Sequence, residues 1–260
     1  TRLIMNIAAP CLVFFSLSNS DISLNNMGKF SLCSVSTYVL IGFSSVAFFK
    51  LARLKTKTYF VPFLIGNTGN IGLPLILLSL GETGFSYALV LFSFSCIFTF
   101  TIGLWVTSSN PSYTVLFKQP LVWAALLGAI FLCLGLKLPN TVNSSLKLIG
   151  EITIPMMLMT LGVAVTKLKI NNFKKGFWLT LARTTICIVC ATSLGLVFKL
   201  EQIALIALVL QMATPASVTS YLLSLEFGSE PNDVASLVVV STLMALLIIP
   251  IILAITLPNM

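Results

Sequence analysis

Residues 66–74 read GNTGNIGLP, a polar and glycine-rich run inside an otherwise apolar stretch. A second polar run, QMATPAS, occupies residues 211–217 of another apolar stretch, at an offset of 145 residues. Both runs contain residues that interrupt a helix by permitting unusual backbone angles or by removing a hydrogen-bond donor. These residues are Gly66, Gly69, Gly72, Pro74 and Pro215. Two interrupted membrane helices at matching positions in the two halves of a chain predict a substrate site between them.

The composition is that of a membrane protein. Of the 260 residues, 57% are hydrophobic and 8% are charged, and the mean hydropathy is +1.05. So little polar surface excludes a soluble domain and indicates an all-α polytopic membrane protein. The net charge of +8 comes from Lys and Arg in short loops, where they set orientation, so no nucleic-acid partner is expected. The six cysteines lie in or beside apolar segments and the chain has no His, so we expect no metal or cofactor.

The hydropathy pattern predicts nine spans of roughly 17 to 24 residues, each long enough to cross a bilayer core. They cover about 2–18, 29–50, 59–80, 84–107, 119–136, 150–166, 176–198, 202–224 and 233–256. We therefore expect a multi-pass protein of the cell membrane, which would be the inner membrane if its source is bacterial.

Basic residues predict how the spans are oriented, because cytoplasmic loops carry an excess of Lys and Arg. The expected cytoplasmic side holds ten of them: Arg2, Lys50, Arg53, Lys55, Lys57, Lys118, Lys167, Lys169, Lys174 and Lys175. The expected outer side holds four: Lys29, Lys137, Lys147 and Lys199.

The 145-residue offset aligns more than the two breaks, since Pro10 falls on Pro155 and Lys29 on Lys174. The offset reverses the membrane direction of each matched span, which predicts an inverted repeat, with residues 1–112 as the first copy and 113–260 as the second. The span at 119–136 has no counterpart in the first copy. We therefore expect a five-plus-five fold that lacks its first helix; a nine-helix protein with an asymmetric repeat is the alternative.

The first break carries the candidate substrate-binding residues Asn67, Thr68 and Asn70. Unwound backbone in a bilayer must line a cavity. The amides, the hydroxyl and the free backbone N–H groups would donate hydrogen bonds to a carboxylate, and a half-helix N-terminus adds partial positive charge. The alternative is a kinked helix whose Asn side chains satisfy freed carbonyl groups.

The second break carries fewer donors, and its candidates are Gln211, Thr214 and Ser217. Gln211 could contact the substrate or hold the crossing together, and Thr214 is favoured as a site contact. Arg183 is the one obvious charge predicted inside a span. It could counter an anionic substrate, or its long stem could snorkel to the cytoplasmic surface, which we favour at that depth.

Further features accompany the breaks: Ala8-Ala9-Pro10, Ala213-Thr214-Pro215-Ala216-Ser217, Tyr221, Glu226-Phe227-Gly228 and Pro250. With residues 66–74, they resemble the auxin efflux carrier family over nearly the whole chain, including bacterial members described as malonate-type permeases. The resemblance implies a ten-helix inverted repeat in which two broken helices cross, here at 59–80 and 202–224. It also implies that Asn67 contacts the substrate carboxylate and that a homodimer can form.

The expected function is a secondary or facilitative carrier that moves a small organic anion, malonate-like or auxin-like, by alternating access. The mobile part would cover about 28–116 and 171–260, and the scaffold about 1–27 and 117–170. Alternatives are a sodium-coupled symporter of the same general fold and a transporter-like sensor or channel. A membrane enzyme would need a nucleophile with a base, or paired aspartates, in mid-span, and no such set occurs.

Overall fold

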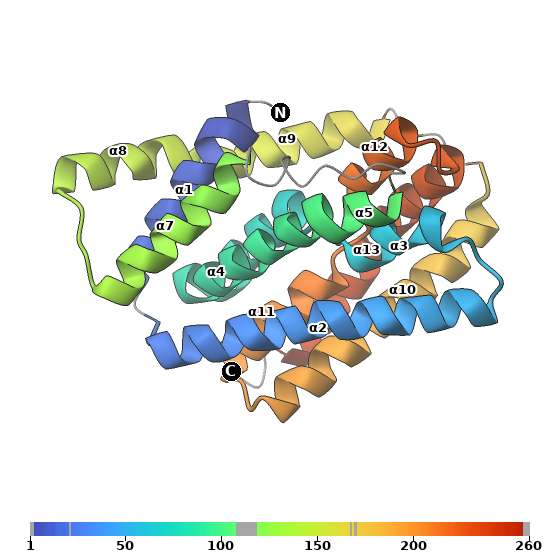
Figure 1. Cartoon of the computed structure of the whole chain (residues 1–260), viewed down its shortest axis with the longest axis horizontal. Helices are drawn as coiled ribbons and strands as arrows, with labels where there is room; N and C mark the ends of the chain where they lie inside the picture. Colours follow the sequence, from blue (N-terminus) through green and yellow to red (C-terminus); the bar gives the residue numbers. More distant parts are fainter. Residues whose placement is uncertain (1–2, 21, 108–118, 167, 169–170, 257–260) are drawn as a thin grey trace.

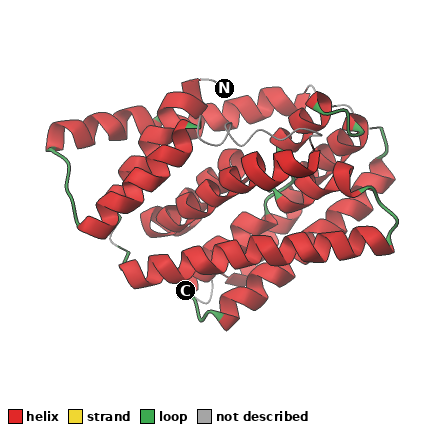
Figure 2. Ribbon diagram, viewed as in Figure 1, coloured by secondary structure: helices red, strands yellow, loops and turns green. Residues whose placement is uncertain are grey.

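A computed structural model of the chain describes residues 3–20, 22–107, 119–166, 168 and 171–256. These residues are almost entirely helical, with short connections between the helices (Figure 2). The expected cytoplasmic residues Arg2, Lys118, Lys167 and Lys169 lie outside the described residues.

The elements, in chain order, are η1 (Ile4–Ala8), α1 (Ala9–Ser18), α2 (Leu24–Leu51), α3 (Thr56–Leu64), η2 (Thr68–Gly72), α4 (Leu73–Phe98), η3 (Thr99–Gly103), α5 (Leu104–Thr107), α7 (Pro120–Leu134), α8 (Asn140–Glu151), α9 (Thr153–Thr166), α10 (Phe173–Val197), α11 (Gln202–Ala213), α12 (Val218–Glu226) and α13 (Pro231–Thr256). The η elements are single π-helical turns that run directly into the next α-helix.

The expected all-α polytopic architecture is confirmed. Within the described residues, five helical stretches are long and apolar enough to cross a membrane: Leu24–Leu51, Thr68–Thr107, Asn140–Ala164, Phe173–Val197 and Pro231–Thr256. Three shorter apolar helices, Asn6–Ser18, Pro120–Leu134 and Gln202–Ala213, lie among them.

Two span boundaries differ from the sequence-based prediction. The span expected at 150–166 begins ten residues earlier, because α8 starts at Asn140 and leads into α9 with only Ile152 between them. The spans expected at 59–80 and 84–107 meet within α4 at Gly81, whose φ of 65° and ψ of −163° turn the backbone sharply. Glycine reaches this positive φ without the steric penalty of a Cβ atom, so it allows the kink.

The connections gather at two ends of the molecule. Among the described connections, residues 52–55, 171–172 and 227–230 lie at the right of Figure 1, and residues 135–139, between α7 and α8, lie at the left. At the right, Lys55 pairs with Glu230 and Lys175 with Asp233, both at 2.5 Å. We call this the basic end, defined by residues 52–55, 171–172 and 227–230, and the other the opposite end. Both expected cytoplasmic clusters contribute described residues here.

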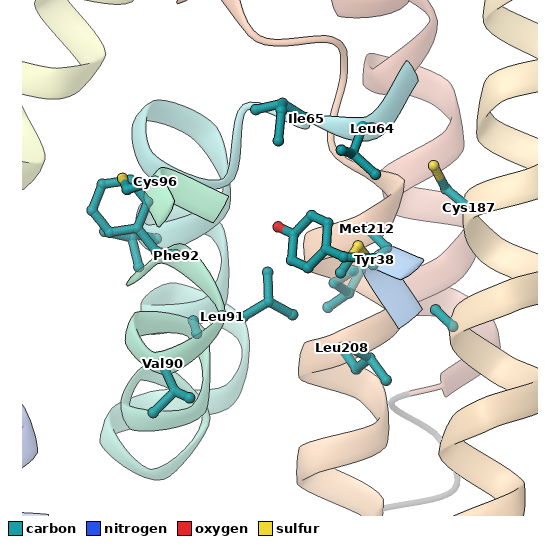
Figure 3. Close-up of a cluster of buried hydrophobic side chains, with 14 of the residues drawn as sticks. Tyr38, Leu64, Ile65, Val90, Leu91, Phe92, Cys96, Cys187, Leu208 and Met212 are labelled. Atoms are coloured by element: carbon teal, nitrogen blue, oxygen red, sulfur yellow. The ribbon is translucent and has the colours of Figure 1, made fainter. Parts of the chain in front are cut away.

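Aromatic and aliphatic side chains fill the space between α2, α4 and α11. Tyr38 is 1% exposed, and its ring lies between α4 and α11 beside Leu91 and Met212 (Figure 3). Its ring also packs against Phe98, with centroids 4.9 Å apart. This packing places the two broken helices side by side, with their interruptions at the same level.

Candidate functional site

The two predicted breaks meet through their backbones. Helix α3 ends at Leu64 and α11 ends at Ala213, and the extended residues that follow form an antiparallel bridge between Gly66 and Ala216. The N–H of Asn67 donates to the carbonyl oxygen of Pro215 at 2.7 Å. The N–H of Ser217 donates to the carbonyl oxygen of Ile65 at 3.2 Å. This pairing satisfies backbone groups that the broken helices leave free inside an apolar environment.

The glycines of the first break serve close packing rather than unusual backbone angles. Neither Gly66 nor Gly72 has a positive φ, so the expected conformational role is wrong at both positions. A Cβ atom on Gly66 would lie 2.5 Å from Oγ1 of Thr214, and one on Gly72 would collide with the side-chain amide of Gln211. Hydrogen in place of a side chain therefore lets the second break approach the first.

Pro74 lies six residues after Thr68 in the continuous helix that η2 and α4 form, so it removes a helical hydrogen-bond donor, as expected. It does not interrupt that helix. The break itself is confined to residues 65–67, because the π-helical turn of η2 begins at Thr68 and continues into α4. Pro215 does interrupt a helix, between Thr214, the C-cap of α11, and Ser217, the N-cap of α12.

A cavity of about 310 Å³ lies against the crossing. Its lining includes Gly66, Asn67, Thr68, Gly69, Asn70 and Ser217 from the predicted sets, together with Val218 and Thr219 at the start of α12. No described residue of this lining carries a charge. The two half-helices that begin at Thr68 and Val218 both present their N-termini to the cavity, where the first N–H groups have no intrahelical acceptor.

The Asn67 side chain is the strongest indication of a ligand in this cavity. Asn67 is 4% exposed, and its Nδ2 has no hydrogen-bond partner in the structure. A buried amide donor without a partner is unfavourable, since it has lost water and gained nothing in return. The same cavity receives two half-helix N-termini with their partial positive charge, and at α12 the N–H of Thr219 already donates to Oγ of Ser217 at 3.2 Å. A negatively charged acceptor would pair with Nδ2 of Asn67 and be favoured by both N-termini.

Two predicted contacts lie away from the cavity. Gln211 is fully buried against Gly72, and both Oε1 and Nε2 lack partners, so it packs within the crossing. Thr214 is also fully buried and donates from Oγ1 to the carbonyl oxygen of Gln211 at 2.6 Å. Neither residue lines the cavity, because the Gln211 side chain packs against Gly72 and the Thr214 side chain packs against Gly66.

Arg183 does not snorkel, so that prediction is wrong. It is 1% exposed, and its guanidinium points inward from α10 to the crossing. Its Nε donates to the carbonyl oxygen of Pro62 at 2.8 Å, and Nη1 donates to that of Thr214 at 2.7 Å. Arg183 also does not line the cavity; Gly66 stands between them, with its missing Cβ position 3.2 Å from Nη2.

Comparison with known proteins agrees with this architecture. The family described as membrane transport protein matches residues 1–116 and 109–253. The chain belongs to this family, that of the auxin efflux carriers. It is also similar to an uncharacterized transporter of Methanocaldococcus jannaschii, at 23% identity over 95% of this chain and 86% of the relative. The expected family resemblance is thus confirmed, and so is the assignment to membrane transport.

Sequence analysis of this membrane transport protein missed several cavity residues. Ser95 and Thr99 from α4 and η3, and Met157 and Thr160 from α9, complete the walls. Ser95 and Thr99 stand four residues apart in an apolar span, a spacing that places both on one helix face and could have indicated the cavity. Nothing local marks Met157 or Thr160, which reach the cavity only through the packing of α9 against η2.

The protein has a second, larger cavity of about 590 Å³ near the opposite end. Its lining includes Asn19, Asn26, Glu82, Lys147 and Glu201, and none of the predicted site residues. Asn26 donates a hydrogen bond to Glu201 across it. We assign the site to the smaller cavity, because that one contains the unpartnered Asn67 donor and both half-helix N-termini.

Proposed function

We propose that this membrane transport protein is a secondary or facilitative carrier of a small organic anion, malonate-like or auxin-like, and that the anion binds at the crossing. The observation that carries the proposal is the buried, unpartnered Nδ2 of Asn67 in a cavity that also receives the N-termini of η2–α4 and α12. A carboxylate supplies the acceptor that Nδ2 of Asn67 lacks and the negative charge that the two N-termini favour.

The neutral lining suits transport rather than tight retention. A hydrogen bond to a charged group contributes about 1.5–3 kcal/mol, so a few neutral donors hold a carboxylate firmly enough for recognition. They do so without a salt bridge that would slow its release. A cavity of about 310 Å³ is at the small end of ligand pockets, which favours a compact acid.

The two cavities support an alternating-access mechanism. Each lies between the proposed scaffold and the proposed mobile part. At the crossing, α9 faces η2 and α12; at the opposite end, α1 and α8 face α4, the first turn of α2 and Glu201, the N-cap of α11. The site cavity shares Thr160, Ala164, Val218 and Leu222 with an apolar cavity that extends to Leu168, near the basic end. We infer a conformation open toward the basic end, which the charge bias assigns to the cytoplasm.

Helix directions support the proposed inverted repeat. Helix α2 runs from the opposite end to the basic end, whereas α10, its counterpart under the 145-residue offset, runs the other way (Figure 1). The broken pairs α3–α4 and α11–α12 are reversed in the same sense. Helix α2 begins at Leu24, so we place the boundary of the mobile part in the loop before it.

The test is uptake of radiolabelled carboxylates into proteoliposomes that contain the purified protein. Malonate, other mono- and dicarboxylates and an indole carboxylate are compared for the parent and for Asn67→Ala. Loss of one donor to a carboxylate is expected to weaken apparent affinity by about tenfold to a hundredfold. Because Asn67 Nδ2 has no protein partner, thermal stability in detergent should stay close to that of the parent.

Asn25→Ala is the matched control, since Asn25 is exposed in the first turn of α2 and far from the crossing. It should transport as the parent does. Saturable uptake that Asn67→Ala leaves unchanged would remove Asn67 from the site. Conductance without saturation would favour a channel, and absence of uptake for every acid tested would leave a sensor as the better reading.

A further inference from the structure

Arg183 holds together the ends of the two half-helices that point away from the cavity. Pro62 belongs to the last turn of α3, and Thr214 is the C-cap of α11. A helix leaves its final carbonyl groups without intrahelical donors, and Arg183 donates to one such carbonyl from each helix, at 2.8 and 2.7 Å. The side chain comes from a third helix, α10, so the contact ties three elements at the crossing.

The charge of this guanidinium is balanced by helix ends rather than by a carboxylate. The ion pairs of the described residues are Lys55–Glu230, Lys147–Glu151 and Lys175–Asp233, and none involves Arg183. Burying an unpaired charge is strongly unfavourable. Each helix C-terminus carries about half a negative charge, so two of them together match one positive charge. The position is therefore built for a monovalent cation.

In carriers with broken helices, half-helix C-terminal ends and unwound carbonyl groups are where a coupling Na⁺ or H⁺ binds. We propose that Arg183 is a tethered cation that occupies this place permanently, so that transport proceeds without an inorganic cation bound at the crossing. The inference rests on the proposed carrier function and adds how that carrier is coupled. It assigns Arg183 a positioning role, because the residue acts on the anion only through the backbone at Gly66.

This arrangement keeps a positive charge next to the anion site at any concentration of free cations in the medium. Gly66 lines the cavity on one side, and its missing Cβ position lies 3.2 Å from Nη2 of Arg183 on the other. A free cation at the same place would leave when its concentration fell, and affinity for the anion would fall with it. A tethered guanidinium removes that dependence.

The first experiment measures thermal unfolding of the purified protein in detergent with Na⁺, K⁺, N-methylglucamine or millimolar guanidinium as the added cation. For Arg183→Ala, we expect guanidinium to raise the unfolding temperature saturably. The parent and Arg53→Ala should not respond, since Arg53 is an exposed loop residue of the same type. An Arg183→Ala protein that is folded and insensitive to guanidinium would overturn the inference, whatever the transported substrate is.

The second experiment measures proteoliposome uptake at fixed pH and membrane potential with the same cations. The parent should transport equally, within about twofold, in Na⁺, K⁺ and N-methylglucamine. Arg183→Ala should lose at least about tenfold in N-methylglucamine and regain activity with guanidinium, as expected for loss and return of charge-assisted hydrogen bonds. A parent that requires Na⁺ would overturn the tethered-cation role while leaving the carrier function intact.

Two further variants keep the test decisive if Arg183→Ala does not fold. Arg183→Lys retains a cation and should keep more stability than Arg183→Gln, which can donate a hydrogen bond but carries no charge. Equal behaviour of the Lys and Gln variants would show that charge is not what the crossing needs. If the parent transports none of the acids, the proposed function fails, and the unfolding measurements still decide the role of Arg183.

Discussion

Gly66→Ala tests whether close approach of the two breaks holds the crossing together. Its Cβ would lie 2.5 Å from Oγ1 of Thr214, about 1 Å short of a normal packing distance. Rotation of the Thr214 side chain would break its hydrogen bond to the carbonyl oxygen of Gln211, and Arg183 and the backbone of Gln211 close other directions. We therefore expect the breaks to separate. This separation would disrupt the backbone bridge between Gly66 and Ala216.

The expected loss follows from the contacts. Overpacking of this kind typically costs about 1–3 kcal/mol. Separation of the breaks also weakens two backbone hydrogen bonds, those of Asn67 to Pro215 and Ser217 to Ile65, at about 1 kcal/mol each. We expect a loss of about 3–5 kcal/mol, which corresponds to a fall in unfolding temperature of about 6–20 °C for a chain of this size.

The assay is thermal unfolding in detergent, with a double-mutant cycle and a matched control. Thr214→Ala alone removes one hydrogen bond, from Oγ1 to Gln211, and should cost about 1 kcal/mol. Combined with Gly66→Ala, it makes room for the new Cβ, so the two changes should couple favourably by about 1–2 kcal/mol. Gly28→Ala, where a Cβ meets nothing within 4 Å, should be neutral or stabilising by up to about 1 kcal/mol.

Two results would refute this reasoning. One is a Gly66→Ala protein as stable as Gly28→Ala, which would mean that the breaks do not approach each other as closely as the structure has them. The other is strict additivity of Gly66→Ala and Thr214→Ala, because two side chains that collide cannot act independently.

Three further predictions concern the crossing, the ends and the orientation. Gln211→Met should keep or raise thermal stability, because both polar atoms of Gln211 are buried without partners, and a marked loss would point to a bound water or ion that they hold. Lys55→Ala should cost less than about 1 kcal/mol and matter less at high salt, since Lys55 and Glu230 are 72% and 41% exposed; a larger, salt-independent loss in thermal unfolding would contradict this. Arg53→Cys should react with impermeant thiol reagents only from the cytoplasm and Glu82→Cys only from outside, and the reverse labelling would overturn the proposed orientation.

The sequence predicted the two breaks and much of the cavity that they line. Asn67, Thr68 and Asn70 were recognisable because polar side chains inside an apolar span indicate unwound backbone that lines a cavity. The nine consecutive residues 66–74 are enough to show this pattern. The role of the glycines in close packing could not be recognised from the sequence. Gly66 and Gly72 are matched to Thr214 and Gln211, which lie some 140 residues away in the chain.

Arg183 is a second residue whose contacts could not be predicted from the sequence. Its depth in an apolar span was clear from the sequence, but the side chain could reach either the surface or the interior. Which way it points depends on the rotation of α10 against α2, α11 and α13, helices that come from both halves of the chain. The two carbonyl acceptors become available only after both half-helices have ended at the same level.

Local chemistry, then, was enough to determine that this protein is a helical membrane protein, where its two broken helices lie and which polar residues interrupt them. Hydropathy and backbone preference act over one or two helical turns, so they can be predicted directly from the sequence. Tertiary structure alone decided that the breaks pair, that Gln211 and Thr214 fill the crossing rather than the cavity, and that Arg183 joins two helix ends. Those features depend on how distant helices rotate and pack to satisfy buried backbone groups away from water.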